Sequence, residues 1–173
     1  ERTPPKNREL VIPERADNMQ KVFAYLCQTR KIDSKMVSNL ARNGLLYQDK
    51  RGNAVFVHRD EIGKIVGAEL QGTNSYQRFK GGAAGTSDSV FSVKIGTPNR
   101  AYVFESAIDM LSFRQLANPA KIQDSVLVSM AGLKPNSLKA LSERGMKLYS
   151  CLDNDEAGIK FTNTHGLIPC NRI

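Results

Sequence analysis

The sequence predicts a mixed α/β protein built from two small domains, an α+β part followed by a parallel sheet flanked by helices. Three observations support this fold class. The 173 residues are 40% hydrophobic and 24% charged, which is enough apolar material for a real core. Strand-like runs separated by turns fill the middle of the chain, and after residue 98 strand-like runs alternate with helical ones. Such alternation is typical of right-handed crossovers and a parallel sheet.

The first part of the chain divides into a tail and an α+β domain. Residues 1–17 are rich in proline and charge, and we interpret them as a tail or linker. The N-terminal domain, residues 18–97, begins with apolar residues at helical spacing after the candidate cap Asn18, and a second helix runs from the candidate cap Asp33 to Gly44. Residues 45–47, 53–58 and 64–70 predict a short antiparallel meander, residues 72–88 a long exposed loop, and residues 90–95 one more strand.

The second domain, residues 98–173, carries the βα alternation. Apolar runs at 101–104, 125–130 and 147–152 predict strands, and residues 106–116, 136–144 and 155–164 predict helices. Gly158 lies inside the last of these helices, where glycine costs about 1 kcal/mol relative to alanine. We therefore expect another part of the backbone to approach it closely.

Positive charge is concentrated in the first hundred residues. They hold 17 basic and 10 acidic side chains, whereas residues 101–173 hold 8 and 7, within a net charge of +8. A basic excess favours a polyanionic partner. The three cysteines are scattered and odd in number, which argues against a disulfide framework and favours a reducing compartment. No apolar run approaches the roughly 20 residues of a membrane span, and we expect no membrane partner.

Acidic residues stand at the ends of the first and third strands of the second domain: Glu105, Asp109, Asp153 and Asp155. Ligands bind outside the carboxyl ends of the strands in an open parallel sheet. Carboxylates that repel one another indicate a cation, and hard oxygen ligands suit Mg²⁺. The alternative is local: Ser106 with Asp109, and Asp153 with Glu156, also fit capping boxes at helix starts.

These acids lie in segments that resemble a known family. Residues 103–109 (VFESAID), 128–132 (VSMAG) and 152–158 (LDNDEAG) resemble the successive motifs of the Toprim domain, which bacterial DNA primases, topoisomerases and some nucleases share. Upstream, Tyr25-Leu26 with Arg30, and the GKIVG of residues 63–67, resemble the segment that precedes Toprim in bacterial primase. The resemblance is strongest to primase-like Toprim proteins of conjugative and other mobile elements, and it covers residues 20–162.

The resemblance implies a role for each acid. Glu105 is implied to act as a general acid or base or as a metal ligand, and Asp109 as an additional catalytic acid. Glu105, Asp153 and Asp155 are implied to hold Mg²⁺, with Mn²⁺ as a substitute. Gly132 and Gly158 are implied to shape the backbone at the cleft.

The resemblance also implies a function and partners. It implies primase-like nucleotidyl transfer in the replication or transfer of mobile-element DNA, in the bacterial cytoplasm. The implied partners are a single-stranded DNA template, nucleotides, and a helicase or relaxase of the same element. Two alternatives stay open: a non-catalytic DNA-binding module of a mobile element, and a Toprim-type metal-dependent nuclease.

Three basic residues, Arg78, Lys80 and Lys94, border the glycine-rich stretch and are candidates for nucleic-acid binding, since aromatic residues are interleaved with them. The alternative is that these charges are only solvated. Two departures from the family pattern stand out. Gln71 occupies the position before Gly-Thr where relatives carry an arginine, which removes one phosphate-binding fork. The chain also ends soon after the last helix, so we expect an abbreviated or truncated Toprim domain.

Overall fold

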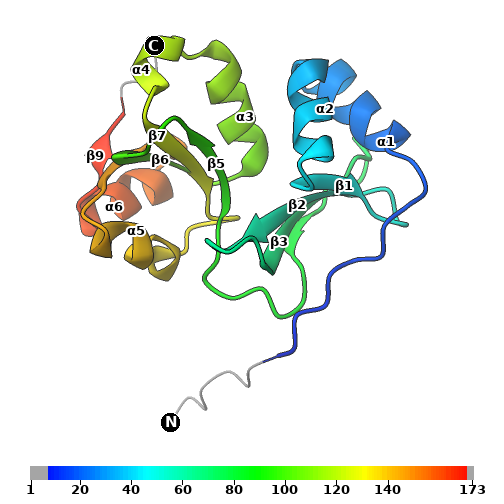
Figure 1. Cartoon of the computed structure of the whole chain (residues 1–173), viewed down its shortest axis with the longest axis horizontal. Coiled ribbons are helices and arrows are strands. Elements are labelled where there is room, and N and C mark those ends of the chain that lie inside the picture. Colours follow the sequence, from blue (N-terminus) through cyan, green and yellow to red (C-terminus); the bar gives the residue numbers. More distant parts are fainter. Residues whose placement is uncertain (1–7, 171–173) are drawn as a thin grey trace. The chain divides into compact units, whose positions relative to one another are not determined.

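The structure is a computed structural model that describes residues 8–170 and confirms the mixed α/β fold class (Figure 1). The chain divides into two compact units, Glu1–Ser89 and Val90–Ile173. This division falls before the strand at residues 91–95, whereas the sequence analysis set the domain boundary after it. Among the described residues, no helix is both long enough and apolar enough to cross a membrane.

The helical part of the first unit starts with α1 (Gln20–Phe23), which runs directly into a π-helical segment, η1 (Ala24–Thr29), and is followed by α2 (Ser34–Arg42). The predicted cap Asp33 is confirmed, because its carboxylate accepts hydrogen bonds from the backbone N–H groups of Lys35 at 2.8 Å and Met36 at 3.1 Å. The predicted cap Asn18 is off by one residue, because Met19 is the N-cap of α1, although the Asn18 side chain does accept from the Gln20 N–H at 3.1 Å.

Four antiparallel strands form the sheet of the first unit, in the order β1 (Leu46–Gln48), β2 (Ala54–Arg59), β3 (Ile65–Gln71) and β4 (Lys80–Gly82). The first three are the predicted meander. The expectation of an uninterrupted loop over residues 72–88 is wrong, because β4 lies inside it and pairs with β3. Two of the three β4 residues are glycines, so the strand has no apolar alternation by which a sequence pattern could reveal it.

The described part of the predicted tail, residues 8–17, is packed against the first unit, and we call it the strap. The Val11 N–H donates to the Ala84 carbonyl at 2.8 Å, and the Tyr47 hydroxyl donates to the Pro13 carbonyl at 2.7 Å. The Arg15 guanidinium lies 4.6 Å from the centre of the Tyr47 ring. The strap is therefore held by backbone pairing and by one buried tyrosine rather than trailing free of the sheet.

The second unit is a five-stranded sheet in the order β5-β7-β6-β8-β9, formed by β5 (Phe91–Ile95), β6 (Arg100–Phe104), β7 (Ser125–Ser129), β8 (Lys147–Ser150) and β9 (Ile168–Pro169). As predicted, β6 pairs in parallel with both β7 and β8. The sheet is nevertheless mixed, since β5 is antiparallel to β7. That pairing places β5 in the second unit.

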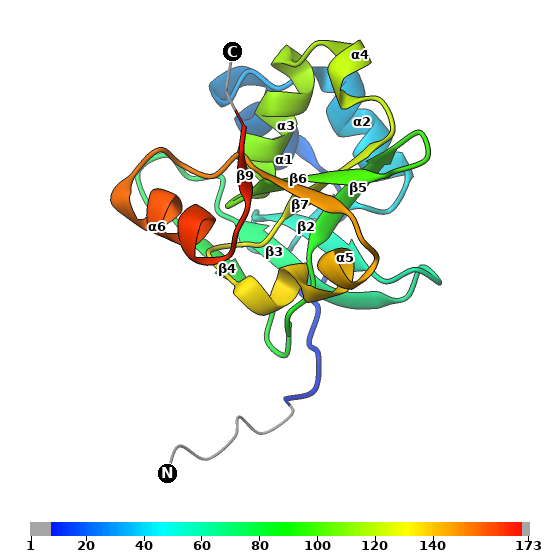
Figure 2. The same ribbon diagram turned by 90° about the vertical axis from the view of Figure 1, so that its left-hand side faces the viewer.

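Helices cover both faces of this sheet (Figures 1 and 2). One face carries α3 (Ala107–Leu116), whose Phe113 ring packs at a tilt against Tyr102 and Phe104, with centroid distances of 5.5 and 5.0 Å. The other carries α5 (Lys139–Glu143) and α6 (Glu156–Thr164), whose apolar residues pack with Ala101 and Val103. The short helices α4 (Pro119–Ile122) and η2 (Pro135–Leu138) complete the connections. Alternate β6 residues thus serve opposite cores, as expected of a covered strand.

Candidate active site

The carboxyl ends of β6 and β8 meet at one edge of the second unit's sheet. Val103 of β6 is paired with Ser150 of β8, and the N–H of Cys151 donates to the Val103 carbonyl at 2.9 Å. Glu105 is the first residue after β6, and Asp153 is the third after β8. Because the two strands are parallel neighbours, these two acids belong to the same edge of the sheet, as the sequence analysis expected.

The segment after β7 is tied to the same edge by Gly132. Its N–H donates to the Glu105 carbonyl at 2.9 Å, and its backbone has a φ of 109°. A Cβ at this position would meet no atom within 4 Å. Gly132 is therefore needed for its left-handed conformation, which side chains disfavour, and not because the backbone around it is crowded.

Ser106 and Asp109 form the predicted capping box at the start of α3. The Ser106 hydroxyl oxygen accepts from the Asp109 N–H at 3.2 Å, and its proton is directed at the Asp109 carboxylate, 2.5 Å away. Asp109 is half-buried and lies in the first turn of α3, where the helix dipole favours a negative charge. Ser106 thus caps α3 and its hydroxyl holds the Asp109 carboxylate, so a catalytic role of Asp109 would be additional.

The second predicted capping box is wrong in one residue. Asp155, not Asp153, is the N-cap of α6, and its carboxylate accepts from the Gly158 N–H at 2.8 Å. Gly158 does meet the expected close approach: an added Cβ would lie 2.1 Å from the Asp153 carbonyl oxygen. The turn between β8 and α6 therefore folds back on its own helix, and only glycine leaves room for it.

The side chains at this edge are of the type that binds a divalent cation, but they are not arranged around a single position. Glu105 is half-exposed, Asp153 and Asp155 are exposed, and all three carry the hard oxygen donors that Mg²⁺ prefers. Within residues 8–170, no group of three His, Cys, Asp or Glu side chains is placed to hold a metal ion. The structure thus brings the acids to one edge without closing them around one point.

A pocket of about 480 Å³ lies beside Asp153 in the second unit. Its walls come from the end of β8, from α6 and from β9, and they include Leu152, Asn154, Ile159 and Asn163. The acidic edge is therefore next to a space bounded by both apolar and amide side chains.

The three predicted nucleic-acid-binding residues are divided between the two units. Arg78 and the exposed Lys80 belong to the first unit, whereas Lys94 lies exposed on β5 in the second. Gln71 is buried, with its side-chain amide donating to the Phe79 carbonyl at 3.4 Å. The Gln71 side chain thus braces the loop that bears Arg78.

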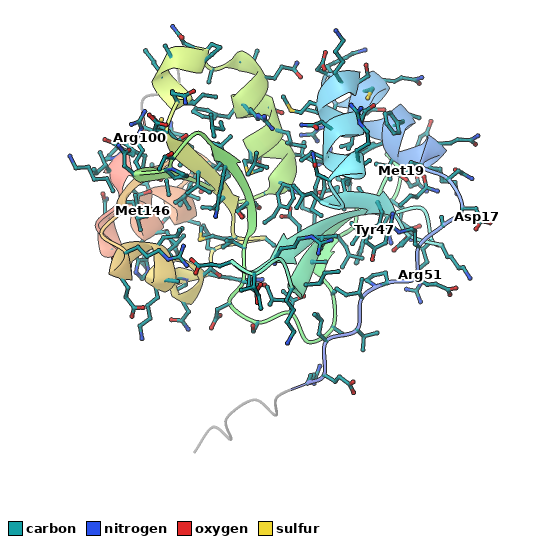
Figure 3. All side chains as sticks on the ribbon, viewed as in Figure 1. Asp17, Met19, Tyr47, Arg51, Arg100 and Met146 are labelled. Atoms are coloured by element: carbon teal, nitrogen blue, oxygen red, sulfur yellow. The ribbon has the colours of Figure 1, made fainter. Side chains whose placement is uncertain are left out.

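Sequence reasoning missed two cations that the fold places with Arg78. Lys21 of α1 and Arg51 of the β1–β2 turn line the same pocket of about 760 Å³. Figure 3 labels Arg51 on the first unit. Lys21, Arg51 and Arg78 are far apart in sequence and share no motif, so no local pattern could have grouped them.

Two family models match the chain. Residues 102–168 match a domain described as Toprim-like, which confirms the resemblance seen in the sequence motifs. Residues 24–98 match a family described as a protein of unknown function, DUF3991.

Curated relatives and solved structures extend these matches. An uncharacterised protein of pXO2 from Bacillus anthracis is 36% identical over 152 residues, which cover 79% of this chain and 44% of that protein. A 65 kDa protein of Zymomonas mobilis is 34% identical over 119 residues, or 64% of this chain and 20% of that protein. The chain spans less than half the length of either relative. The RNA polymerase domain of the Mycobacterium tuberculosis primase DnaG shares the fold, with a TM-score of 0.52 at 16% identity over 86% of this chain and 64% of that one.

Proposed function

Because residues 102–168 form a Toprim-like domain, we propose that the protein is a divalent-metal-dependent, primase-like nucleotidyltransferase of a mobile element. The observation that carries this proposal is the parallel pairing of β6 with β8, which assigns Glu105 and Asp153 to one sheet edge. The primase fold neighbour and the pXO2 relative support the reaction class and the mobile-element setting, respectively.

Each acid has a proposed role at this edge. Glu105, Asp153 and Asp155 would hold Mg²⁺ or Mn²⁺, and such an ion, when bound, neutralises charge that develops on phosphate oxygens. Glu105 is also the proposed acid or base. Asp109, whose carboxylate is oriented by the Ser106 hydroxyl, is the proposed additional catalytic acid.

The proposed substrates are a single-stranded DNA template and nucleotides. Arg78, Lys80 and Lys94 are the proposed contacts to the nucleic acid, with exposed side chains able to reach phosphate. A helicase or relaxase of the same element is the proposed partner, and the bacterial cytoplasm is the proposed location.

Oligonucleotide synthesis tests the proposal. The purified protein, given Mg²⁺ or Mn²⁺, a single-stranded DNA template and labelled nucleotides, is expected to make short oligomers. Glu105→Gln and Asp153→Asn should each abolish synthesis. Glu156→Gln is the matched control, since Glu156 is an acid of the same α6 turn outside the proposed ligand set, and it should retain activity. Synthesis that survives both Glu105→Gln and Asp153→Asn would refute the assignment.

Asp155→Asn separates ligation from capping. Asparagine is as good an N-cap as aspartate, so the thermal stability of this variant should stay near that of the wild type. Its metal-dependent synthesis should nevertheless fall, because an amide is a weaker cation ligand than a carboxylate. A fall in activity that tracks a fall in melting temperature would assign Asp155 to the cap alone.

One observation favours a second candidate function. No three acids are gathered for a metal within the described residues, which suits a DNA-binding module without catalysis. Metal-independent DNA binding with no turnover would select that function. A Toprim-type nuclease would use the same acids, and nicking of the template in the same assay would select it instead.

A further inference from the structure

One pocket of the first unit is lined by basic side chains and by no acidic ones. Lys21, Arg51 and Arg78 contribute to the pocket of about 760 Å³, and none of its lining residues is Asp or Glu. A volume of this size is within the range of small-ligand sites, about 300–1,000 Å³. Three cations that converge on one space without a carboxylate favour an anionic ligand.

The other lining residues indicate which anion. Two aromatic rings, Tyr25 and the half-exposed Phe79, border the same space, together with amide side chains from η1, from the β1–β2 turn and from the β3–β4 loop: Gln28, Asn53, Asn74 and Gln77. Aromatic faces stack on nucleobases, and amides can pair with their polar edges. A plain phosphate site would need neither.

The pocket is held in shape before any ligand binds. The Thr73 hydroxyl donates to the Gly52 carbonyl at 2.7 Å, which fixes the β3–β4 loop to the β1–β2 turn. A Cβ added at Gly52 would lie 2.8 Å from Cδ of Lys21. The Lys21 side chain therefore packs directly against this turn. On the loop itself, the Gly72 N–H donates to the Phe79 carbonyl at 2.8 Å. Preorganisation of this kind lowers the entropy cost of binding.

The helical wall of the pocket has an uncommon geometry. Ala24, Tyr25, Gln28 and Thr29 line it, and all four belong to the π-helical segment η1. The Arg30 N–H bonds to the Tyr25 carbonyl at 2.9 Å, the i→i+5 spacing of a π-helix. Short π-helical turns are rare and are found frequently at functional sites.

We propose that this pocket binds a nucleotide, with its phosphate on Lys21, Arg51 and Arg78 and its base against Tyr25 or Phe79. The shared chemistry is a phosphate joined to a base, whether the nucleotide is free or part of a single strand. This inference deepens the proposed function and rests on it for the choice of nucleic acid. It adds Lys21, Tyr25 and Arg51, and it needs no metal.

Binding in EDTA tests the site on the full chain. Fluorescence anisotropy would follow a labelled single-stranded hexanucleotide, with an unlabelled nucleoside triphosphate as competitor. Lys21→Gln, Arg51→Gln and Arg78→Gln are each expected to weaken binding and to reduce the slope of log K against log salt by roughly 0.7. Lys64→Gln removes a charge from the β2–β3 turn, outside the pocket, and should change affinity little.

Substitutions of aromatic residues test base stacking independently of the charges. Phe79→Leu is expected to weaken binding about fivefold or more through lost stacking, whereas Tyr76→Leu, at a fully exposed ring outside the pocket, should weaken it less. Competition by the triphosphate would identify a free nucleotide as the ligand, and its absence would identify the strand.

The inference is overturned if Lys64→Gln weakens binding as much as Arg51→Gln does, or if the three pocket variants bind as tightly as the wild type while circular dichroism shows them folded. Failure of synthesis with binding intact would count against the proposed function alone. Synthesis by the wild type with pocket variants that bind normally would count against the pocket alone.

Discussion

Gly158 is the residue at which backbone geometry constrains the sequence most directly. A Cβ added at this residue would lie 2.1 Å from the Asp153 carbonyl oxygen, which is too close for any side chain. The Gly158 carbonyl accepts from the Thr162 hydroxyl at 2.8 Å. The glycine that is unfavourable for the helix is thus required by the turn that carries Asp153 and Asp155.

Gly158→Ala is expected to lower the free energy of unfolding by about 1–3 kcal/mol, since relief of the clash needs a backbone shift. Gly82→Ala is the control, because its Cβ would have its nearest neighbour at 3.7 Å. Urea denaturation followed by circular dichroism measures both variants. Equal stability of the two proteins would contradict the crowding seen at Gly158.

Tyr47 predicts a dependence of stability on pH. Burial raises the pKa of its phenol and nearby Asp49 adds to the rise, while the positive charge of Arg15 opposes it. The native state therefore favours the neutral phenol, whose hydroxyl donates to the Pro13 carbonyl. The stabilisation is complete below the unfolded pKa of about 10 and is lost as the pH rises through the folded value.

Denaturation of the wild type at pH 8 and at pH 11 should therefore show a loss of stability at the higher pH. Tyr47→Phe should be less stable than the wild type at pH 8, because it lacks the hydrogen bond, and should lose less on the rise to pH 11. The same pH-dependent loss in both proteins would show that other groups cause it.

Among the elements, the first helix depends on a residue from a strand. Gln48 of β1 is buried, and its side-chain oxygen accepts from the N–H groups of Lys21 at 2.9 Å and Val22 at 3.2 Å. These are groups of the first helical turn, which lack partners within the helix. The same contact fixes the backbone of Lys21, which lines the proposed nucleotide pocket.

Gln48→Met keeps the length of the side chain but removes this acceptor. We expect it to lower the free energy of unfolding by about 1–3 kcal/mol, the cost of leaving buried donors unsatisfied. Gln20→Met, at an exposed position of α1, should change stability by no more than about 0.5 kcal/mol. Thermal melts measure the stability of both variants. Matching melting temperatures would refute the capping role of Gln48.

The elements that could be predicted are those with a repeating pattern or a cap. The apolar runs at β6, β7 and β8 and the capping residues Asp33 and Ser106 gave the order and type of most elements. The strand β4 and the strap could not be found this way, because they are held by backbone pairing that leaves no side-chain periodicity. At the site, motif order placed Glu105 and Asp153, but Lys21 and Arg51 required the tertiary fold.

At the scale of the whole molecule, the division into two compact units predicts that a substitution can destabilise one unit without destabilising the other. Phe56 and Phe104 are fully buried in the first and second unit, respectively. Replacing either with alanine is expected to cost about 3–5 kcal/mol. Hydrogen exchange followed by mass spectrometry should then accelerate mainly in the unit that carries the substitution, and equal acceleration of both units would show that they unfold as one.

The buried amide of Gln71 limits which side chains position 71 can accept. A mutation to arginine would not simply add a phosphate contact, because the new guanidinium would start in a site where Gln71 is 6% exposed and already donates to the Phe79 carbonyl. An isolated buried charge is costly. A solvent-exposed arginine at position 71 would therefore require the β3–β4 loop to be rebuilt at the same time.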